Sequence, residues 1–290
     1  APSEPAPSDP APSKPEPSDS TPPPPSIDPL TIDVGDVSSF VVGPKHAALR
    51  SLTIDGCGTL ADLVPLRGLP AGIEIQLGKS NCLTVERLDG IEHAGALTAF
   101  AIVLDVSALS HATQLRRLSL RNGPLPMAGL VALKLPSLRS LDVNLRKSSR
   151  GDVQRLLEAP LLGMLDELGI TLDAAPALPA LPRLRSLDVS LFPDDTRRGE
   201  FRFLRAVPNL KRLRIGGVEQ ADLGPIVALR ELDTLDVAGV CRIDARPLAK
   251  LPKLSWVTIS RLVDEAHKPV RAGLEVHRSN PYALCSPPRP

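Results

Sequence analysis

Residues 229–259 read LRELDTLDVAGVCRIDARPLAKLPKLSWVTI and contain one apolar pattern twice. Residues 232–237 form an L-x-x-L-x-L phrase, and residues 254–259 form it again 22 positions later, with Val and Ile among the anchors. A Pro-Leu-x-x-Leu segment joins the two phrases. Apolar residues that alternate with polar ones indicate a strand with one buried face. The stretch therefore predicts two copies of one unit that pack against each other.

The phrase recurs along most of the chain. We take the last apolar residue of each copy as its anchor. The anchors of consecutive copies are separated by 21, 27, 18, 23, 27, 19, 26, 22, 22 and 17 residues, a mean of about 22. Periods of 20 to 29 with this consensus are typical of leucine-rich repeats, whose coils must stack because one coil cannot bury its apolar face alone. We predict a right-handed α/β repeat solenoid with a parallel concave sheet of roughly eleven strands and a convex side of loops, 3₁₀ turns and short helices. The anchors are Ile54, Ile75, Ile102, Leu120, Val143, Ile170, Val189, Ile215, Val237, Ile259 and Val276.

Composition divides the chain into three parts. Residues 1–29 are rich in Pro, Ser and acidic residues, so we expect a disordered, polyproline-like spacer. Residues 30–278 form the predicted solenoid, which a half-buried strand near Leu30 and Ile32 caps at its N-terminal end. Residues 279–290 form a C-terminal tail. Spacers of this kind often separate an exported bacterial domain from its anchor, so we expect any signal peptide or lipidated Cys to lie upstream.

The connecting segments carry a second motif. Residues 62–69, 222–229 and 244–251 each read D-h-x-P-h-x-x-L, where h is apolar, and residues 105–109 match with Ala in place of Pro. Together with Leu88-Asp89-Gly90-Ile91-Glu92, they resemble the repeats of bacterial internalin-like leucine-rich repeat proteins over residues 45–278. The resemblance implies 3₁₀ turns on the convex side. Locally, the Asp can accept hydrogen bonds from free amides of the turn.

This chain departs from the internalin-like pattern after each strand. That family carries Asn there and stacks the side-chain amides along the solenoid. We therefore expect no Asn ladder and less regular coils. Two connections are long enough for short convex helices, at residues 149–158 and 194–206. The positions that replace Asn are Cys57, Gly78, Asp105, Gly123, Arg146, Asp173 and Phe192.

Composition and charge exclude several classes of protein. The net charge is +1, from 34 basic and 33 acidic residues, and aromatic residues make up only 2% of the chain. A nucleic-acid partner is not expected, since such proteins rely on clustered positive charge and stacking aromatics. The sequence has no apolar run of about 18 residues, so we expect no transmembrane segment.

The four cysteines leave two possibilities open. Cys57 and Cys82 follow consecutive predicted strands and either form a disulfide across adjacent coils or remain free thiols. Cys241 and Cys285 lie farther apart in the predicted array, which favours free thiols. The sequence contains no C-x-x-C pair, so nothing in the cysteine spacing indicates a zinc site.

No catalytic motif emerges. Residues 78–80, Gly-Lys-Ser, lack the preceding Gly of a phosphate-binding loop, and the five histidines show no metal-ligand spacing. The tripeptide Arg150-Gly151-Asp152 matches the one that integrins bind, but it falls at a predicted helix start, whereas such binding needs a flexible loop tip. We predict no enzymatic activity and no cofactor.

The outward residues of the strands are the remaining candidates for a site. We predict a non-enzymatic binding protein, extracellular or in the cell envelope, that recognises a protein or glycan through its concave face. The alternative is a cytoplasmic scaffold or enzyme inhibitor with the same solenoid. Interface energy concentrates in Trp, Tyr and Arg. The predicted partner-binding residues are Arg117, Arg121, Asp142, Asp188, Arg212, Arg214, Asp236 and Trp256.

Overall fold

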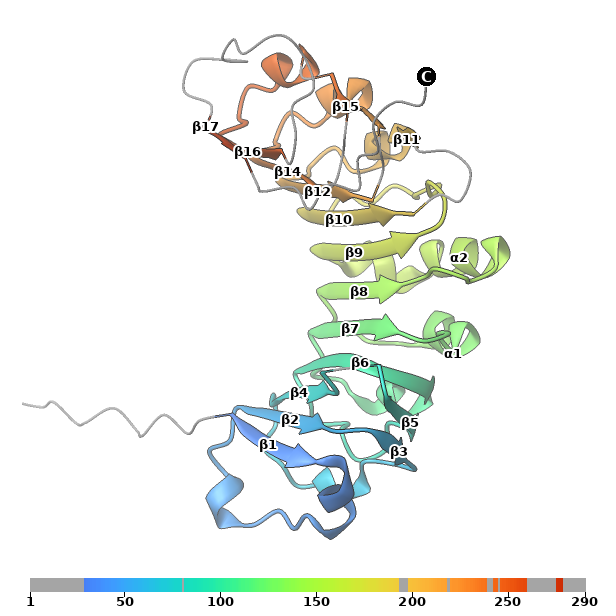
Figure 1. The fold of residues 1–290 in the computed structure, drawn as a ribbon, viewed down its shortest axis with the longest axis vertical. Helices are drawn as coiled ribbons and strands as arrows, with labels where there is room; N and C mark the ends of the chain where they lie inside the picture. The colour runs from blue at the N-terminus through green and yellow to red at the C-terminus, as the bar shows by residue number, and fades with distance from the viewer. Residues whose placement is uncertain are drawn as a thin grey trace, which may run out of the picture.

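The computed structural model describes residues 29–79, 81–192, 198–217, 220–238, 242–244, 246–259 and 275–278. The strands stack along one long axis into an arc, from the N-terminal coils to the C-terminal coils (Figure 1). The spacer predicted for residues 1–29, apart from Pro29, and the tail predicted for residues 279–290 lie outside these ranges.

One parallel sheet of 14 strands runs the length of the described chain. Twelve of its strands follow one another in chain order, which confirms the predicted parallel concave sheet with one strand more than the roughly eleven expected. The twelve are β1 (Leu30–Asp33), β2 (Ser51–Asp55), β4 (Glu74–Leu77), β6 (Ala96–Asp105), β7 (Arg117–Asn122), β8 (Ser140–Asn144), β9 (Glu167–Leu172), β10 (Ser186–Leu191), β12 (Arg212–Gly216), β14 (Thr234–Ala238), β16 (Trp256–Ile259) and β17 (Glu275–Arg278).

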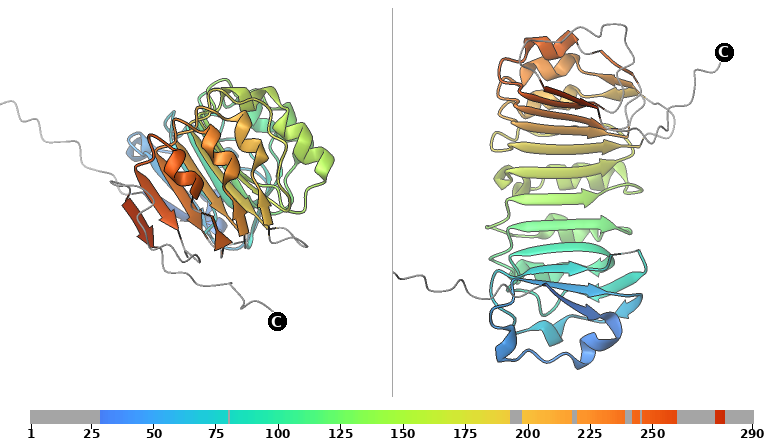
Figure 2. Two further views of the ribbon diagram at one scale, coloured as in Figure 1. Left: turned by 90° about the horizontal axis from the view of Figure 1, so that it is seen from above. Right: turned by 60° about the vertical axis from the view of Figure 1, so that its left-hand side comes forward.

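Turns and helices form the second layer, behind the sheet (Figure 2). The strand anchors that face this layer are fully buried, as Leu97, Leu213 and Leu235 show with exposures of 0%, 1% and 0%. Their neighbours along the stack are other aliphatic anchors, for example Leu235 between Leu213 and Val257. Each coil therefore completes the core of the next, as repeat architectures require.

The register corrects two of the predicted anchors. Ile54 pairs with Leu77, Leu77 with Ala99, and Ala99 with Leu120. The four coils that contain β2, β4, β6 and β7 are thus spaced 23, 22 and 21 residues apart, where anchors at Ile75 and Ile102 predicted 21, 27 and 18. This end of the solenoid is more regular than the sequence pattern indicated.

Strand β6 explains the error at Ile102. Its register with β7 shifts between Ala99 and Ile102, and on its other side its two halves have different neighbours. The first half continues the stack from β4, whereas Ile102 and Val103 pair with β5 (Leu83–Arg87), which in turn pairs with β3 (Gly58–Leu60). The apolar run from Ala96 to Val103 therefore contains two sets of anchors.

The Asp turns behave as the connecting motif predicted. Asp62, Asp105, Asp222 and Asp244 each accept a hydrogen bond from the backbone N–H two residues later, at 3.1, 2.8, 2.8 and 3.0 Å. Each precedes a 3₁₀ turn, in chain order η3 (Val64–Leu66), η4 (Ser107–His111), η7 (Gly224–Ala228) and η8 (Arg246–Lys250).

Of the two predicted helices, one is confirmed and one is wrong. Helix α2 (Arg150–Leu157) begins at Ser149, whose Oγ accepts from the N–H of Asp152 at 3.1 Å. In the second segment residues 194–197 lie outside the described ranges, and the rest forms β11 (Arg198–Glu200) and a 3₁₀ turn, η6 (Arg202–Ala206). Pairing explains the difference, because β11 joins a small parallel sheet with β13 (Gln220–Asp222) and β15 (Arg242–Ile243).

The remaining described elements are α1 (Met127–Ala132) and three 3₁₀ turns, η1 (Val34–Ser39), η2 (Pro44–His46) and η5 (Pro160–Met164). None of the described helices is long and apolar enough to cross a membrane.

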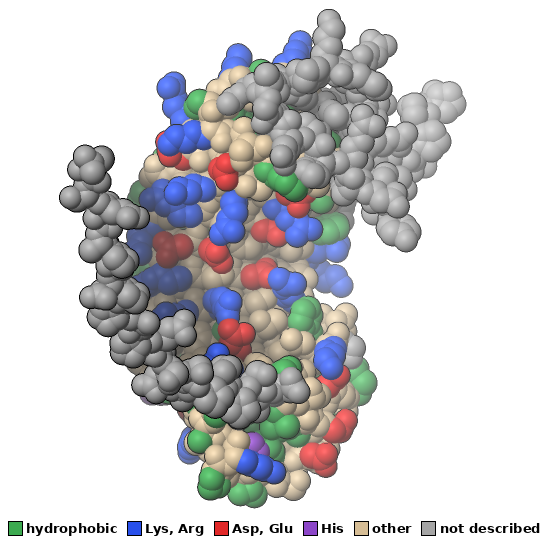
Figure 3. Space-filling view, turned by 90° about the vertical axis from the view of Figure 1, so that its left-hand side faces the viewer, with side chains coloured by type: hydrophobic (Ala, Val, Ile, Leu, Met, Phe, Trp, Pro, Cys, Tyr) green, Lys and Arg blue, Asp and Glu red, His purple; other side chains and the backbone are tan. Residues whose placement is uncertain are grey.

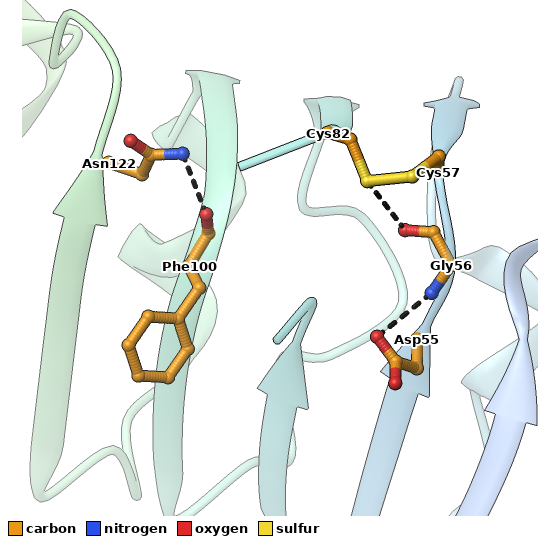
Figure 4. The surroundings of a disulfide bond; sticks show 6 residues. All are labelled: Asp55, Gly56, Cys57, Cys82, Phe100 and Asn122. Carbon is orange, nitrogen blue, oxygen red and sulfur yellow. Dashed lines mark hydrogen bonds between the residues drawn. A yellow bond between two sulfur atoms is a disulfide. The ribbon is translucent and has the colours of Figure 1, made fainter. Parts of the chain in front are cut away.

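Coil-to-coil bridges connect several strand ends. The Asn122 side-chain amide donates to the Phe100 carbonyl at 2.8 Å (Figure 4), and that of Asn144 donates to the Arg121 carbonyl at 3.2 Å. Two asparagines thus bridge neighbouring coils, although no Asn stands at the positions where the internalin-like pattern has its ladder. Both are the last residues of their strands, β7 and β8, whereas the expected ladder positions of these two coils follow the strands.

A disulfide joins Cys57, just after β2, to Cys82, just before β5 (Figure 4). This settles the first of the two open pairings, because the parallel pairing of β3 with β5 brings both residues to the same edge. Cys241 and Cys285 lie outside the described residues.

We expect the Cys57→Ser/Cys82→Ser variant to lose about 3 kcal/mol of unfolding free energy. The bond closes a loop with a sequence separation of 25 residues, and such a crosslink restricts the unfolded chain by about this amount. Urea unfolding of the oxidised protein and the variant measures the difference. Equal midpoints and slopes would show that the bond does not stabilise the fold.

Candidate binding face

The outward side chains of the sheet form two long rows, because parallel register places equivalent positions of successive strands side by side. The first row is Ser51, Glu74, Ala96, Arg117, Ser140, Glu167, Ser186, Arg212, Thr234 and Trp256. The second row is Thr53, Gln76, Thr98, Ser119, Asp142, Gly169, Asp188, Arg214, Asp236 and Thr258. Seven of the eight predicted binding residues lie in these rows, and Arg121 lies at the end of β7.

Two ion pairs in the first row skip a strand. Arg117 pairs with Glu74 across Ala96, and Arg212 pairs with Glu167 across Ser186 at 3.3 Å. The intervening side chains are small, which leaves room for the long arginine side chain to reach the second neighbour. All four charged side chains remain about half exposed, so a partner can still contact them.

The Arg121 side chain contacts an aspartate, a serine and an aromatic ring. Its guanidinium lies 2.6 Å from Asp142, donates to the Ser119 hydroxyl at 3.2 Å, and lies 5.7 Å from the centre of the Phe100 ring. Ser119 also hydrogen-bonds to Asp142, at 3.1 Å. This cluster presents a rigid arginine, and preorganised side chains lose less entropy on binding.

A second cluster contains two aspartates and one arginine. Arg214 lies between Asp188, at 3.7 Å, and Asp236, at 3.4 Å, on three consecutive strands. Burial raises the pKa of both carboxyls above the ordinary value although Arg214 lowers each, and for Asp188 the nearby Asp142 and Asp236 charges add to the increase. Keeping Asp188 ionised therefore opposes folding.

Gly169 separates this cluster from the Arg121 cluster. It lies in the register between Asp142 and Asp188, and a Cβ atom there would come within 2.8 Å of the Asp142 carboxylate. The glycine therefore provides the space that the Asp142 side chain occupies.

We expect Asp188→Asn to leave stability at pH 7 unchanged or higher, by no more than about 1 kcal/mol. A carboxyl whose folded pKa is raised stabilises the fold only while protonated, so wild type loses this contribution as pH rises from about 4 through the raised pKa. The amide variant has no such loss. Chemical denaturation of both proteins between pH 3 and 7 should show the difference shifting toward the variant. A variant less stable than wild type at pH 7 would contradict the prediction.

Trp256 sits at the end of the first row. Its ring Nε1 donates to the Thr258 hydroxyl at 3.0 Å, and the residue is 38% exposed. Its direct neighbour on β14 is Thr234, while Asp236 pairs with Thr258, so the tryptophan adjoins the Arg212 side of the face. The side chains of Glu275 and His277, also expected on this face, lie outside the described ones.

Sequence reasoning missed a third row, made of the residues directly before the strands. Successive backbone hydrogen bonds connect them along the stack, for example from Arg139 N to Arg116 O at 2.9 Å and from Lys211 N to Arg185 O at 2.8 Å. We call this the strand-start row; from β6 to β14 it is Gly95, Arg116, Arg139, Asp166, Arg185, Lys211 and Asp233. The signal in the sequence is the charged residue that follows each buried leucine before a strand, such as Leu115 or Leu138.

A groove of about 740 Å³ lies where the first row meets the strand-start row. Gly72 and Gly95 contribute to its lining, and a Cβ on Gly95 would lie only 2.6 Å from the Gly72 carbonyl oxygen. The close backbone packing thus occurs where residue 72, two positions before β4, and residue 95, directly before β6, have no side chains. The charged lining residues are Glu74, Arg116, Arg117, Arg139, Asp166 and Glu167.

Most charged side chains of the described face are paired with one another. Among the described residues, no group of three or more His, Cys, Asp or Glu side chains is placed to hold a metal ion. Arg150-Gly151-Asp152 lies in the first turn of α2, where Asp152 bonds to Ser149, so it is not presented on a loop tip. The arrangement suits recognition of a large polar surface.

The repeat register, the continuous parallel sheet and the Asp turns define the chain as a leucine-rich repeat protein. No protein-family model matches it, and no curated protein sequence is detectably similar to it. Among solved structures, an internalin of Listeria monocytogenes aligns with a TM-score of 0.48 and 19% identity, over 84% of this chain and 68% of the internalin. A chain of the mouse RP105/MD-1 complex aligns with a TM-score of 0.46 and 20% identity, over 75% and 39% of the two chains. At these identities the likeness concerns the fold alone.

Proposed function

We propose that this chain is a non-enzymatic binding protein, secreted or in the cell envelope, that recognises a protein or glycan through its concave face. One observation carries the proposal: the outward rows form a continuous surface of half-exposed arginine and carboxylate side chains, fixed in place by neighbouring coils. A curved sheet of this length offers a large area to one partner.

The disulfide supports the location. Disulfides persist mainly in oxidising compartments, and Cys57–Cys82 joins two adjacent coils on the strand-end side. This weighs against the alternative of a cytoplasmic scaffold or enzyme inhibitor. The Pro-rich residues 1–29 are in keeping with a spacer that holds the solenoid away from an anchor.

Affinity capture with the solenoid from envelope and soluble fractions tests the proposal. We expect wild type to retain an envelope or extracellular partner and the Arg212→Ala/Arg214→Ala/Trp256→Ala variant to lose at least tenfold in affinity for it, since these side chains share one face. A triple variant on the opposite layer, Arg150→Ala/Val153→Ala/Arg155→Ala in helix α2, is the control. Equal capture by wild type and the concave-face variant would show that the partner does not bind through the concave face.

A further inference from the structure

The strand-start side of the concave face carries more positive charge than its centre. From β4 to β12 this side bears seven basic side chains and three carboxylates, Glu74, Asp166 and Glu167, which gives 7 − 3 = +4. Over the same strands the centre bears Arg121 and Arg214 against Asp142 and Asp188, which gives 2 − 2 = 0. Figure 3 shows Lys and Arg side chains gathered along one edge of this face. The seven basic residues are Arg116, Arg117, Arg139, Arg183, Arg185, Lys211 and Arg212.

Five of the seven basic side chains have a partner within the described chain, and two do not; among the five, Arg139 lies 4.0 Å from Asp166 and Arg185 donates to the Asn209 carbonyl. Arg117 and Arg212 pair with Glu74 and Glu167, and Arg183 reaches Asp166 at 3.8 Å. Neither Arg116 nor Lys211 forms an ion pair or a side-chain hydrogen bond with any described residue, and both are exposed. These two side chains are free to contact a partner.

The spacing of the row limits what such a partner can be. Arg116 and Lys211 lie at the ends of a five-residue ladder, four coil steps apart, or about 19 Å at ~4.8 Å per step. An extended peptide places same-face side chains about 6.7 Å apart, so three of its intervals span this distance. The groove of about 740 Å³ can admit one end of such a segment, because it extends along the ladder from Arg116 to Asp166, while Lys211 lies beyond it.

The carboxylates in the strand-start row and its groove favour a polypeptide partner over a partner with uniform negative charge. Asp166 interrupts the basic row between Arg139 and Arg185, and Glu74 and Glu167 line the same groove. A sulfated glycan would meet these three negative charges along its length. A peptide can place acidic side chains on the arginines and backbone N–H groups opposite the carboxylates.

We propose that the strand-start row and its groove bind an extended acidic segment of a protein partner. The proposal deepens the concave-face function and depends on it. Guanidinium–carboxylate pairs would provide the contacts, and the unpaired Arg116 and Lys211 would fix the two ends of the segment.

The test uses a fluorescein-labelled (Ser-Glu)₅ peptide and the full chain, with affinity measured by fluorescence anisotropy at 50 and 500 mM NaCl. We expect measurable binding at low salt, weakened at least tenfold at high salt and at least tenfold by Arg116→Gln/Lys211→Gln. Both residues are exposed and neither side chain forms a described ion pair or hydrogen bond, so the variant should fold as wild type does. The matched control is Lys147→Gln/Arg155→Gln, which removes two positive charges beyond the opposite ends of the strands and should change affinity less than twofold.

Three outcomes would overturn the proposal: equal binding by the two variants, equal binding of a (Ser-Gln)₅ peptide, or tighter binding of a sulfated octasaccharide than of the acidic peptide. These failures are distinct from failure of the proposed function. If a captured partner still requires Arg212, Arg214 and Trp256 while (Ser-Glu)₅ does not bind, the concave face binds something else.

Discussion

Replacing Gly90 by Ala is expected to lower the unfolding free energy by about 3 kcal/mol or more. The backbone φ of Gly90 is +102°, a conformation that L-residues rarely adopt. An added Cβ would lie 2.2 Å from the carbonyl oxygen of Leu63 and 2.7 Å from the Cα of Val64. Those atoms belong to the backbone of the preceding coil, which cannot move without breaking the hydrogen bond from Leu63 N to Asp89 O. Urea denaturation measures the loss.

Gly72→Ala is the matched control for Gly90→Ala. Gly72 has a φ of +81°, but a Cβ there would meet nothing within 4 Å, so only backbone strain of about 1 to 2 kcal/mol is expected. Similar losses for the two variants would show that contact between coils is not what requires glycine at position 90. The large difference we expect explains why the Leu88–Glu92 motif contains its glycine.

Leu235→Ala, in the most regular coil, is expected to lose about 3 to 5 kcal/mol. Leu235 is 0% exposed and packs in register between Leu213 and Val257, so truncation leaves a cavity shared by three coils. Because each coil contacts only its neighbours, the coils C-terminal to the cavity should unfold first. Limited proteolysis followed by mass spectrometry should show early cleavage after β14, and urea denaturation gives the free energy.

Val227→Ala provides the comparison for Leu235→Ala. Val227 lies in the turn η7 of the same coil but is 38% exposed, so its truncation should change stability by less than about 1 kcal/mol. A loss as large as that of Leu235→Ala would contradict the account of the core.

The sequence predicted the features that depend on one coil at a time. The buried anchors follow a period of two within each strand, and the Asp turns require only an Asp two residues before a free amide. The outward residues could be named for the same reason. Each of these features is encoded locally, so no knowledge of the stacking was needed.

Features that depend on how coils align were missed or misplaced. Ile102 looked like an anchor because β6 carries two sets of buried residues on either side of a register shift, but the buried residues of the second set are Ala101 and Val103. The pairing of Arg117 with Glu74 requires the register and the small side chain of Ala96 between them. The short strands β11, β13 and β15 carry too few residues to show a period, and they exist because equivalent positions of successive coils coincide.

Carboxyl footprinting of the solenoid with and without a captured partner tests the central claim, recognition through the concave face, most directly. Carbodiimide labelling followed by mass spectrometry reports the accessibility of each carboxylate. We predict that the partner protects Glu74, Asp142, Glu167, Asp188 and Asp236, which lie on the outward rows, and leaves Asp152 and Glu158, at helix α2, as reactive as before. Protection of the α2 carboxylates with unchanged labelling of the outward rows would contradict the account.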